Sequence, residues 1–285
     1  QAEDIELISQ RGILNLEKPI PQWSPEMAKL PTTRGDSAFL VIQVVNHHFW
    51  LGGIFYPAVS IHNHVTLNRW FDGMSFLSML VLGFIFMMAF YHFGLFLLRR
   101  QDRASLLFSL FCAVMFIQSI SYRHWLTIIW LHEPTEFNFL LELFMMSIGA
   151  YFGTGLFVTF VSHLFPDEFP KWFSKIVWAI CLILVGLNLI MGPAQGSELT
   201  PAFLILIGIV GLPVVYFLVR ATLAKRLGAG WVLGGFFAML AGTLHDVLSA
   251  QQLWNGNLIL TPFGLLGFFF AQSVILSKRN AIAHA

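Results

Sequence analysis

The chain has 285 residues, of which 57% are hydrophobic and only 11% are charged, and its formal net charge is +1. This composition excludes an ordinary soluble domain. Basic residues do not form a stripe outside the segments that flank the apolar stretches, so we expect membrane lipid and not nucleic acid as a partner. Cys112 and Cys181 both lie inside apolar stretches, which excludes a disulfide framework.

Residues 1–70 differ in kind from the rest of the chain. Residues 1–33 are polar and contain prolines, whereas 37–45 and 54–61 are rich in Val, Ile and Phe, which predicts two strands joined by turn-type residues at 46–53. The first apolar run is too short to cross a bilayer. We therefore expect 1–70 to form a small or incomplete extracytoplasmic β-domain.

Seven charge-poor stretches follow, and each is near the roughly 20 apolar residues that a bilayer about 30 Å thick requires. Only Glu142 interrupts the third. They predict an all-α polytopic membrane protein, a seven-transmembrane helix bundle over 71–277. The stretches are 73–98, 104–122, 137–161, 176–197, 199–219, 227–245 and 258–277.

The distribution of Lys and Arg predicts the orientation of this bundle. One set of loops carries ten basic residues, whereas the alternate set carries only Arg123. This bias predicts an N-terminus outside and a C-terminus in the cytoplasm, with 278–285 as the start of a cytoplasmic linker. The ten are Arg99, Arg100, Arg103, Lys171, Lys175, Arg220, Lys225, Arg226, Lys278 and Arg279.

Three segments resemble one known family. The run MMAFYHFGLFLLRRQDRASLLFSLFCAVMF at 87–116 resembles the first two helices of the bacterial seven-transmembrane receptors with diverse intracellular signalling modules. The segments RGILNL at 11–16 and FLVIQVVNHHFWLGGIF at 39–55 resemble the beginning and the end of the jelly-roll domain that precedes those helices. A jelly roll needs about eight strands, and 17–37 holds one, so either this outer domain is short or its middle is not represented. We favour the second.

The resemblance implies a sensory receptor of the bacterial inner membrane that passes an extracytoplasmic signal to its own cytoplasmic module. That module would be a kinase, a nucleotide cyclase or a phosphatase and would follow Ala285, so the present chain is not expected to be an enzyme. The jelly roll implies a carbohydrate or another small molecule as ligand. Outputs of this kind work in pairs, which implies a homodimer.

Ionisable residues in the spans are costly and mark candidate sites. Glu142 lies near the outer end of the third span, and His245 and Asp246 lie near the outer end of the sixth. Together with nearby loop residues they predict an outward-facing ligand pocket. The alternative is structural: Glu142 would pair with Arg123 or His124, and Asp246 would cap a helix. The predicted pocket residues are Glu142, Arg123, His124, His245, Asp246 and Trp254.

A second hypothesis concerns the inner face, where Tyr91, His92, His163 and Arg220 lie within a turn or two of the predicted boundary. These residues would form a switch that couples helix motion to the output module. The alternative is that each is an ordinary interfacial residue. Pro213 and Pro262 are expected to kink the fifth and seventh spans.

Other function classes have weaker support. Four histidines at 47, 48, 62 and 64 permit a zinc site if 62 and 64 share a strand face, but we expect neither a metal nor a cofactor. A retinal protein needs a Lys in the seventh span, which has none. A transporter and an intramembrane metal-dependent hydrolase remain as alternatives. Gly149 and Gly153 have the spacing that lets helices approach, either within one bundle or between two copies.

Overall fold

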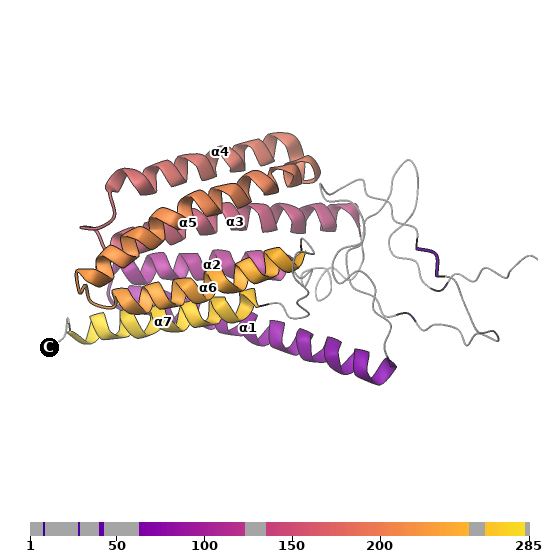
Figure 1. Ribbon diagram of the computed structural model, residues 1–285, viewed down its shortest axis with the longest axis horizontal. Coiled ribbons are helices and arrows are strands. Elements are labelled where there is room, and N and C mark those ends of the chain that lie inside the picture. Colours follow the sequence, from indigo (N-terminus) through magenta and orange to yellow (C-terminus); the bar gives the residue numbers. More distant parts are fainter. Residues whose placement is uncertain are drawn as a thin grey trace, which may run out of the picture.

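The computed structural model describes residues 63–122, 135–250 and 260–282, together with Ile8, Ala28 and residues 40–42. These residues form seven α-helices that run back and forth along one direction (Figure 1). A short 3-10 helix, η2 (Ser197–Leu199), joins the fourth to the fifth. The helices are α1 (His64–Leu98), α2 (Arg103–Tyr122), α3 (Glu136–Leu164), α4 (Lys171–Gly196), α5 (Thr200–Leu223), α6 (Ala229–Ala250) and α7 (Thr261–Ile282).

The helices confirm the predicted bundle, because each predicted span falls largely on one of them. Five helical stretches of the described residues are long and apolar enough to cross a membrane, and one of these, Lys171–Leu223, contains both α4 and α5. A shorter apolar helix, Thr261–Ser277, belongs to α7. Large hydrophobic side chains such as Phe76, Phe90 and Leu212 point outward and are exposed, as expected of surfaces that face lipid tails.

Helix α1 begins earlier than the predicted boundary at 71. The Asn63 side chain accepts a hydrogen bond from the Val65 backbone N–H at 3.0 Å and caps the helix. Its 35 residues correspond to about 52 Å, so α1 is longer than a bilayer core and extends past its neighbours (Figure 1). His64 is thus helical, and its predicted place on a strand is wrong. Residues 40–42 belong to no strand, and the rest of both predicted strands lies outside the described residues.

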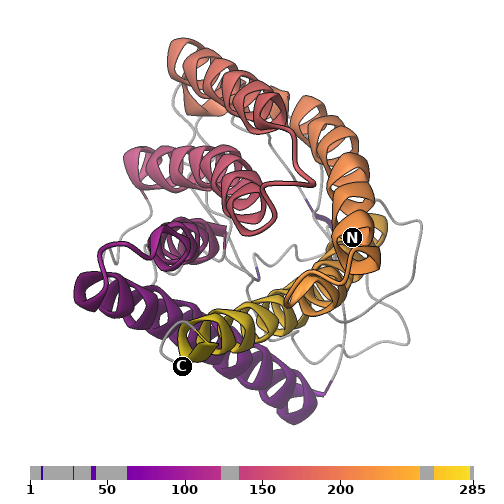
Figure 2. The ribbon, with the colours of Figure 1, turned by 90° about the vertical axis from the view of Figure 1, so that its left-hand side faces the viewer.

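Seen end on, the helices follow one another around the bundle, and α7 returns beside α1 (Figure 2). Phenylalanine rings fill the interior between α2, α3, α6 and α7. Phe157 stacks on Phe236 with ring centroids 5.3 Å apart, and Phe111 meets both Phe157 and Phe268. Because water is absent from a membrane interior, this close packing and not burial from water holds the helices together.

Glycines set the closest approaches between helices. Gly149 and Gly153 lie against α2, and Gly155 lies against α4, so these three serve packing within one bundle. Between α6 and α7, a Cβ atom at Gly242 would lie only 2.7 Å from the Leu260 carbonyl oxygen. The two backbones therefore touch, and no larger residue fits there.

The predicted kink at Pro262 is wrong, whereas the predicted kink at Pro213 stays a prediction. Pro262 lies in the first turn of α7, where its missing N–H costs no helical bond, so it produces no kink. Helix α5 continues through Pro213. The interruption occurs instead in α4 at Gly192, whose φ of 79° and ψ of 163° are non-helical, just before Pro193. Glycine adopts that φ without strain.

Candidate functional site

The bundle has two distinct ends. At the end that we name the basic end, α1, α3, α5 and α7 finish and α2, α4 and α6 begin. All ten basic residues singled out in the sequence lie at or next to this end. The other end, which we name the opposite end, contains Glu142, His245 and Asp246.

Glu142 lies on α3 and is 2% exposed, although a carboxylate is costly to bury. Thr135 starts this helix by accepting a hydrogen bond from the Asn138 backbone N–H at 3.2 Å. The cap places Asn138 and Glu142 one turn apart on the same face, and both side chains are buried. Helix α3 therefore carries a polar strip inside the bundle at the opposite end.

Asp246 organises the start of α7. Its two carboxylate oxygens accept hydrogen bonds from the backbone N–H groups of Leu260 and Thr261, each at 2.8 Å. Its Oδ1 atom also lies 2.9 Å from Nδ1 of His245. These bonds satisfy helix N-terminal donors and place negative charge at the positive end of the helix dipole. The geometry agrees with the structural alternative for Asp246, a helix cap.

Of the predicted pocket residues that the structure describes, Glu142 lies on α3, and His245 and Asp246 lie on α6 at a different depth. Phe157 of α3 and Phe236 of α6 are in contact and give a common reference. At about 1.5 Å of rise per residue, Glu142 lies about 22 Å and Asp246 about 15 Å from that contact toward the opposite end. The two carboxylates are thus about 7 Å, or about one and a half turns, out of register. Arg123, His124 and Trp254 lie outside the described residues.

His92 is the most buried polar residue of α1. Its side chain is 0% exposed, and neither ring nitrogen has a hydrogen-bond partner. The ring packs edge-on against Phe108 of α2 at 4.7 Å, and Phe108 in turn contacts Phe160 of α3 and Phe269 of α7. His92 is therefore directly attached to the phenylalanine core, close to the basic end.

The other predicted switch residues have separate surroundings. Tyr91 is exposed and touches His92 edge-on at 5.0 Å. Arg220 lies over the ring of Tyr216 at 5.9 Å, one turn earlier on the same helix. His163 is exposed on the last turn of α3. The described contacts thus link Tyr91 to His92 but do not join His92 to Arg220.

Sequence reasoning missed an ionic cluster at the basic end. The Arg226 side chain, in the α5–α6 connection, donates from Nε to Oε1 of Glu168 and from Nη2 to Oδ2 of Asp167, each at 2.6 Å. Both carboxylates belong to the α3–α4 connection. The Glu168 side chain is only 6% exposed, whereas that of Asp167 is 66% exposed. The sequence did contain a signal for this cluster, because two loops predicted at the same end of the bundle carry opposite charges.

The cluster lines a cavity of about 280 Å³. The hydrogen bond to Glu168, together with the charges of Glu168 and Asp167, raises the pKa of the guanidinium above its ordinary value. The second oxygen of Glu168 is buried without a hydrogen-bond partner. A charge-assisted pair with one buried member is the kind of contact that fixes the position of a loop.

No metal site emerges from the described residues, since they contain no group of three or more His, Cys, Asp or Glu placed to hold an ion. The predicted hydrolase alternative therefore finds no ligand set in 63–122, 135–250 or 260–282. His47, His48 and His62 lie outside the described residues.

Comparison with known proteins gives one match. The sequence model of the family described as 7TM diverse intracellular signalling matches residues 74–279, which is most of the chain; the match contains α2 to α6 and most of α1 and α7. No curated protein and no solved structure matches it.

Proposed function

Because the chain belongs to the 7TM diverse intracellular signalling family and so has a transmembrane receptor-type role, we propose that it relays an extracytoplasmic small-molecule signal to a cytoplasmic module. The signal would enter at the opposite end of the bundle. It would leave at the basic end, where α7 finishes.

The observation that carries this proposal is the burial of Glu142, which is 2% exposed near one end of α3. A charged residue at the centre of a membrane helix costs about 2.5–3.5 kcal/mol on insertion scales, and ionisable residues in membrane helices commonly mark ligand paths. Asn138 on the same face adds an amide that both donates and accepts hydrogen bonds. A polyhydroxylated small molecule such as a carbohydrate offers complementary groups. We propose Arg123, His124, His245 and Trp254 as further residues of this pocket.

The α6–α7 pair supports transmission along the bundle. Asp246 ties α6 to the first turn of α7 at the opposite end, and the glycine contact between Gly242 and Leu260 follows directly. At midlength a Cβ atom on Gly235 would lie 3.0 Å from the Phe268 Cα atom. We propose that these contacts make the two helices move as one unit, so that a shift at the opposite end reaches the basic end.

Orientation and assembly belong to the same proposal. The excess of Lys and Arg at the basic end supports a cytoplasmic location for that end and an extracytoplasmic N-terminus in the bacterial inner membrane. We further propose that the receptor works as a homodimer with its signalling module. Such a relay requires the ligand to bind two arrangements of the bundle with different affinities.

The test is ligand-dependent stabilisation of the protein in lipid nanodiscs. A panel of monosaccharides and oligosaccharides is screened for compounds that raise the melting temperature of the unaltered protein. At 100 times its Kd a ligand adds about 2.7 kcal/mol of stability. We expect Glu142→Gln to abolish this rise without reducing membrane insertion, and Glu198→Gln, an exposed carboxylate at the same end, to preserve it. If the ligand raised the melting temperature of Glu142→Gln as much as that of the unaltered protein, Glu142 would not be part of the ligand site.

A further inference from the structure

The α3–α4 connection is held firmly in the bundle. Phe165 and Phe169 are each 2% exposed, and Phe169 packs on Phe217 of α5 with ring centroids 4.9 Å apart. Backbone N–H groups of Glu168 and Phe169 both donate to the Phe165 carbonyl, at 3.2 and 3.1 Å. The carboxylate of Glu168 therefore has a fixed place relative to α3 and α5.

Arg226 attaches the α5–α6 connection to that carboxylate. The 2.6 Å bond to Glu168 reaches a buried carboxylate, although the Arg226 side chain is itself 45% exposed, whereas the bond to Asp167 lies at the exposed surface, where ion pairs contribute little. The backbone at Arg226 is also held, because its N–H donates to the Ala221 carbonyl and its carbonyl accepts from the Ala229 N–H. Glu168 therefore contributes, together with these backbone bonds, to the position of this connection.

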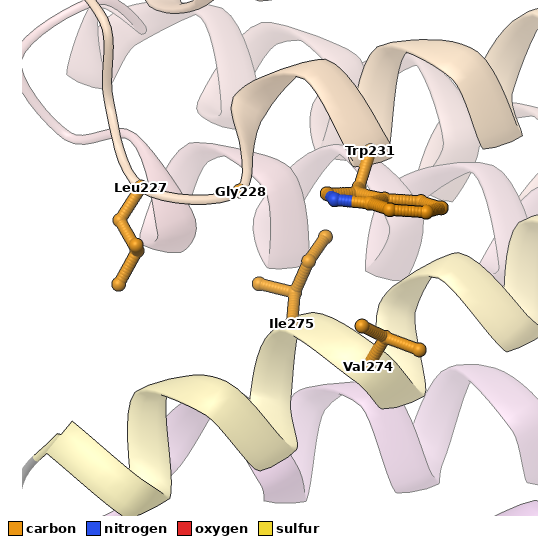
Figure 3. Close-up of a pocket in the computed structure, with 5 residues that line it drawn as sticks. All are labelled: Leu227, Gly228, Trp231, Val274 and Ile275. Carbon is orange, nitrogen blue, oxygen red and sulfur yellow. The ribbon is translucent and has the colours of Figure 1, made fainter.

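Only Leu227 separates Arg226 from Gly228, which lies against α7. Gly228 has a φ of 82°, a left-handed conformation that glycine adopts freely. A Cβ atom here would lie 2.8 Å from Cγ2 of Ile275, which is itself buried. Figure 3 shows the Ile275 side chain pointing from α7 toward Gly228, between Leu227 and Trp231, around a small cavity of about 40 Å³.

We propose that Arg226 is a positioning residue for α7, acting through Leu227 and Gly228 so that a movement of the α3–α4 connection displaces Ile275. This inference rests on the proposed function, in which α7 carries the signal out of the bundle. Ile275 lies less than one turn before Lys278, at the end through which the chain leaves the membrane. In this proposal, the Arg226–Glu168 contact sets the position of Gly228, and the contact of Gly228 with Ile275 then sets the position of α7.

The experiment measures the position of α7 directly. Spin labels are placed on Gln101→Cys, in the α1–α2 turn, and Ser277→Cys, on α7, in the full chain in nanodiscs. Both sites are exposed, whereas Cys112 and Cys181 are buried and stay unlabelled. Pulsed electron paramagnetic resonance then gives the distribution of distances between the two labels, without any ligand.

We expect Glu168→Gln to shift this distribution by about 1–2 Å or to broaden it, as in other helix displacements. Asp167→Asn, the exposed partner, is the matched control and is expected to leave it unchanged. Gly228→Ala is expected to shift it, whereas Gly230→Ala is not, because the nearest atom to that Cβ position is 3.9 Å away. The double variant Glu168→Gln with Gly228→Ala is expected to shift it no more than the larger single effect.

The proposal is overturned if Glu168→Gln lowers the melting temperature while the distance distribution stays as in the unaltered protein. It is also overturned if the two changes add, because they would then act independently. Should Glu168→Gln fail to fold, Arg226→Lys takes its place in the same distance measurement. Lys keeps the charge but lacks the guanidinium donors that reach both carboxylates, so the distribution is expected to shift or broaden, and an unchanged distribution overturns the proposal. A failure of the ligand screen leaves this measurement intact, because the measurement uses no ligand.

Discussion

The indole of Trp178, on α4, lies directly on Gly155 of α3. A Cβ atom at Gly155 would be 2.9 Å from both Cδ2 and Cε2 of the ring, and the indole Nε1–H donates to Oγ1 of Thr159 at 2.7 Å. Thr159 in turn lies 3.1 Å from the Ser174 hydroxyl. A ring contact and a polar chain thus join α3 to α4, where small residues allow the helices to approach.

Gly155→Ala is expected to destabilise the protein by about 1–3 kcal/mol, because the added methyl group overpacks this contact. Thermal unfolding in nanodiscs measures the loss. Gly186→Ala is the control on α4, since nothing lies within 4 Å of its Cβ position, and it is expected to be neutral or slightly stabilising. An unchanged melting temperature for Gly155→Ala would contradict the close contact.

Asp246→Ala is expected to cost about 1–2 kcal/mol, because the Leu260 and Thr261 N–H groups lose their acceptor and the helix dipole loses its counter-charge. Hydrogen–deuterium exchange is expected to accelerate in the first turn of α7. The exposed Asp72 on α1 supplies the control Asp72→Ala. If exchange in α7 stayed slow, the cap would not stabilise this helix.

Gln101→Cys and Glu198→Cys test the proposed orientation. Gln101 lies in the α1–α2 turn at the basic end, and Glu198 lies between α4 and α5 at the opposite end; both are exposed. A membrane-impermeant maleimide is expected to label Glu198→Cys in intact cells and Gln101→Cys only after permeabilisation. Background labelling is low because Cys112 and Cys181 are buried. The reverse labelling pattern would show that the protein is inserted in the opposite orientation.

The helices could be predicted where the hydrophobicity of consecutive residues alone decides the structure. Runs of apolar residues without charge must form helices in lipid, since each backbone group needs an internal partner. The start of α1 was missed because 64–72 mixes apolar residues with polar ones and with Arg69 and Asp72, and hydropathy does not report a helix that continues beyond the membrane. The break at Gly192 was missed because a Gly-Pro pair inside an apolar run is ambiguous between a turn and a packed helix.

The candidate sites depended more on distant contacts. Burial of Glu142 follows from the face of α3 that turns inward, and neighbouring residues alone do not settle that face. Asp246 meets its backbone partners 14 and 15 residues later, and Arg226 meets Glu168 across 58 residues. Contacts at such separations depend on how the helices pack, so no local pattern reports them.

The sequence by itself determined that this protein crosses the membrane with seven helices and concentrates basic residues at one end, because hydrophobicity and charge act on each segment separately. Only the tertiary structure decided which polar groups are buried, that Asp246 caps α7, and that Arg226 joins two connections beside Ile275. Those outcomes depend on the relative position of helices, which close packing of glycines and aromatic rings sets.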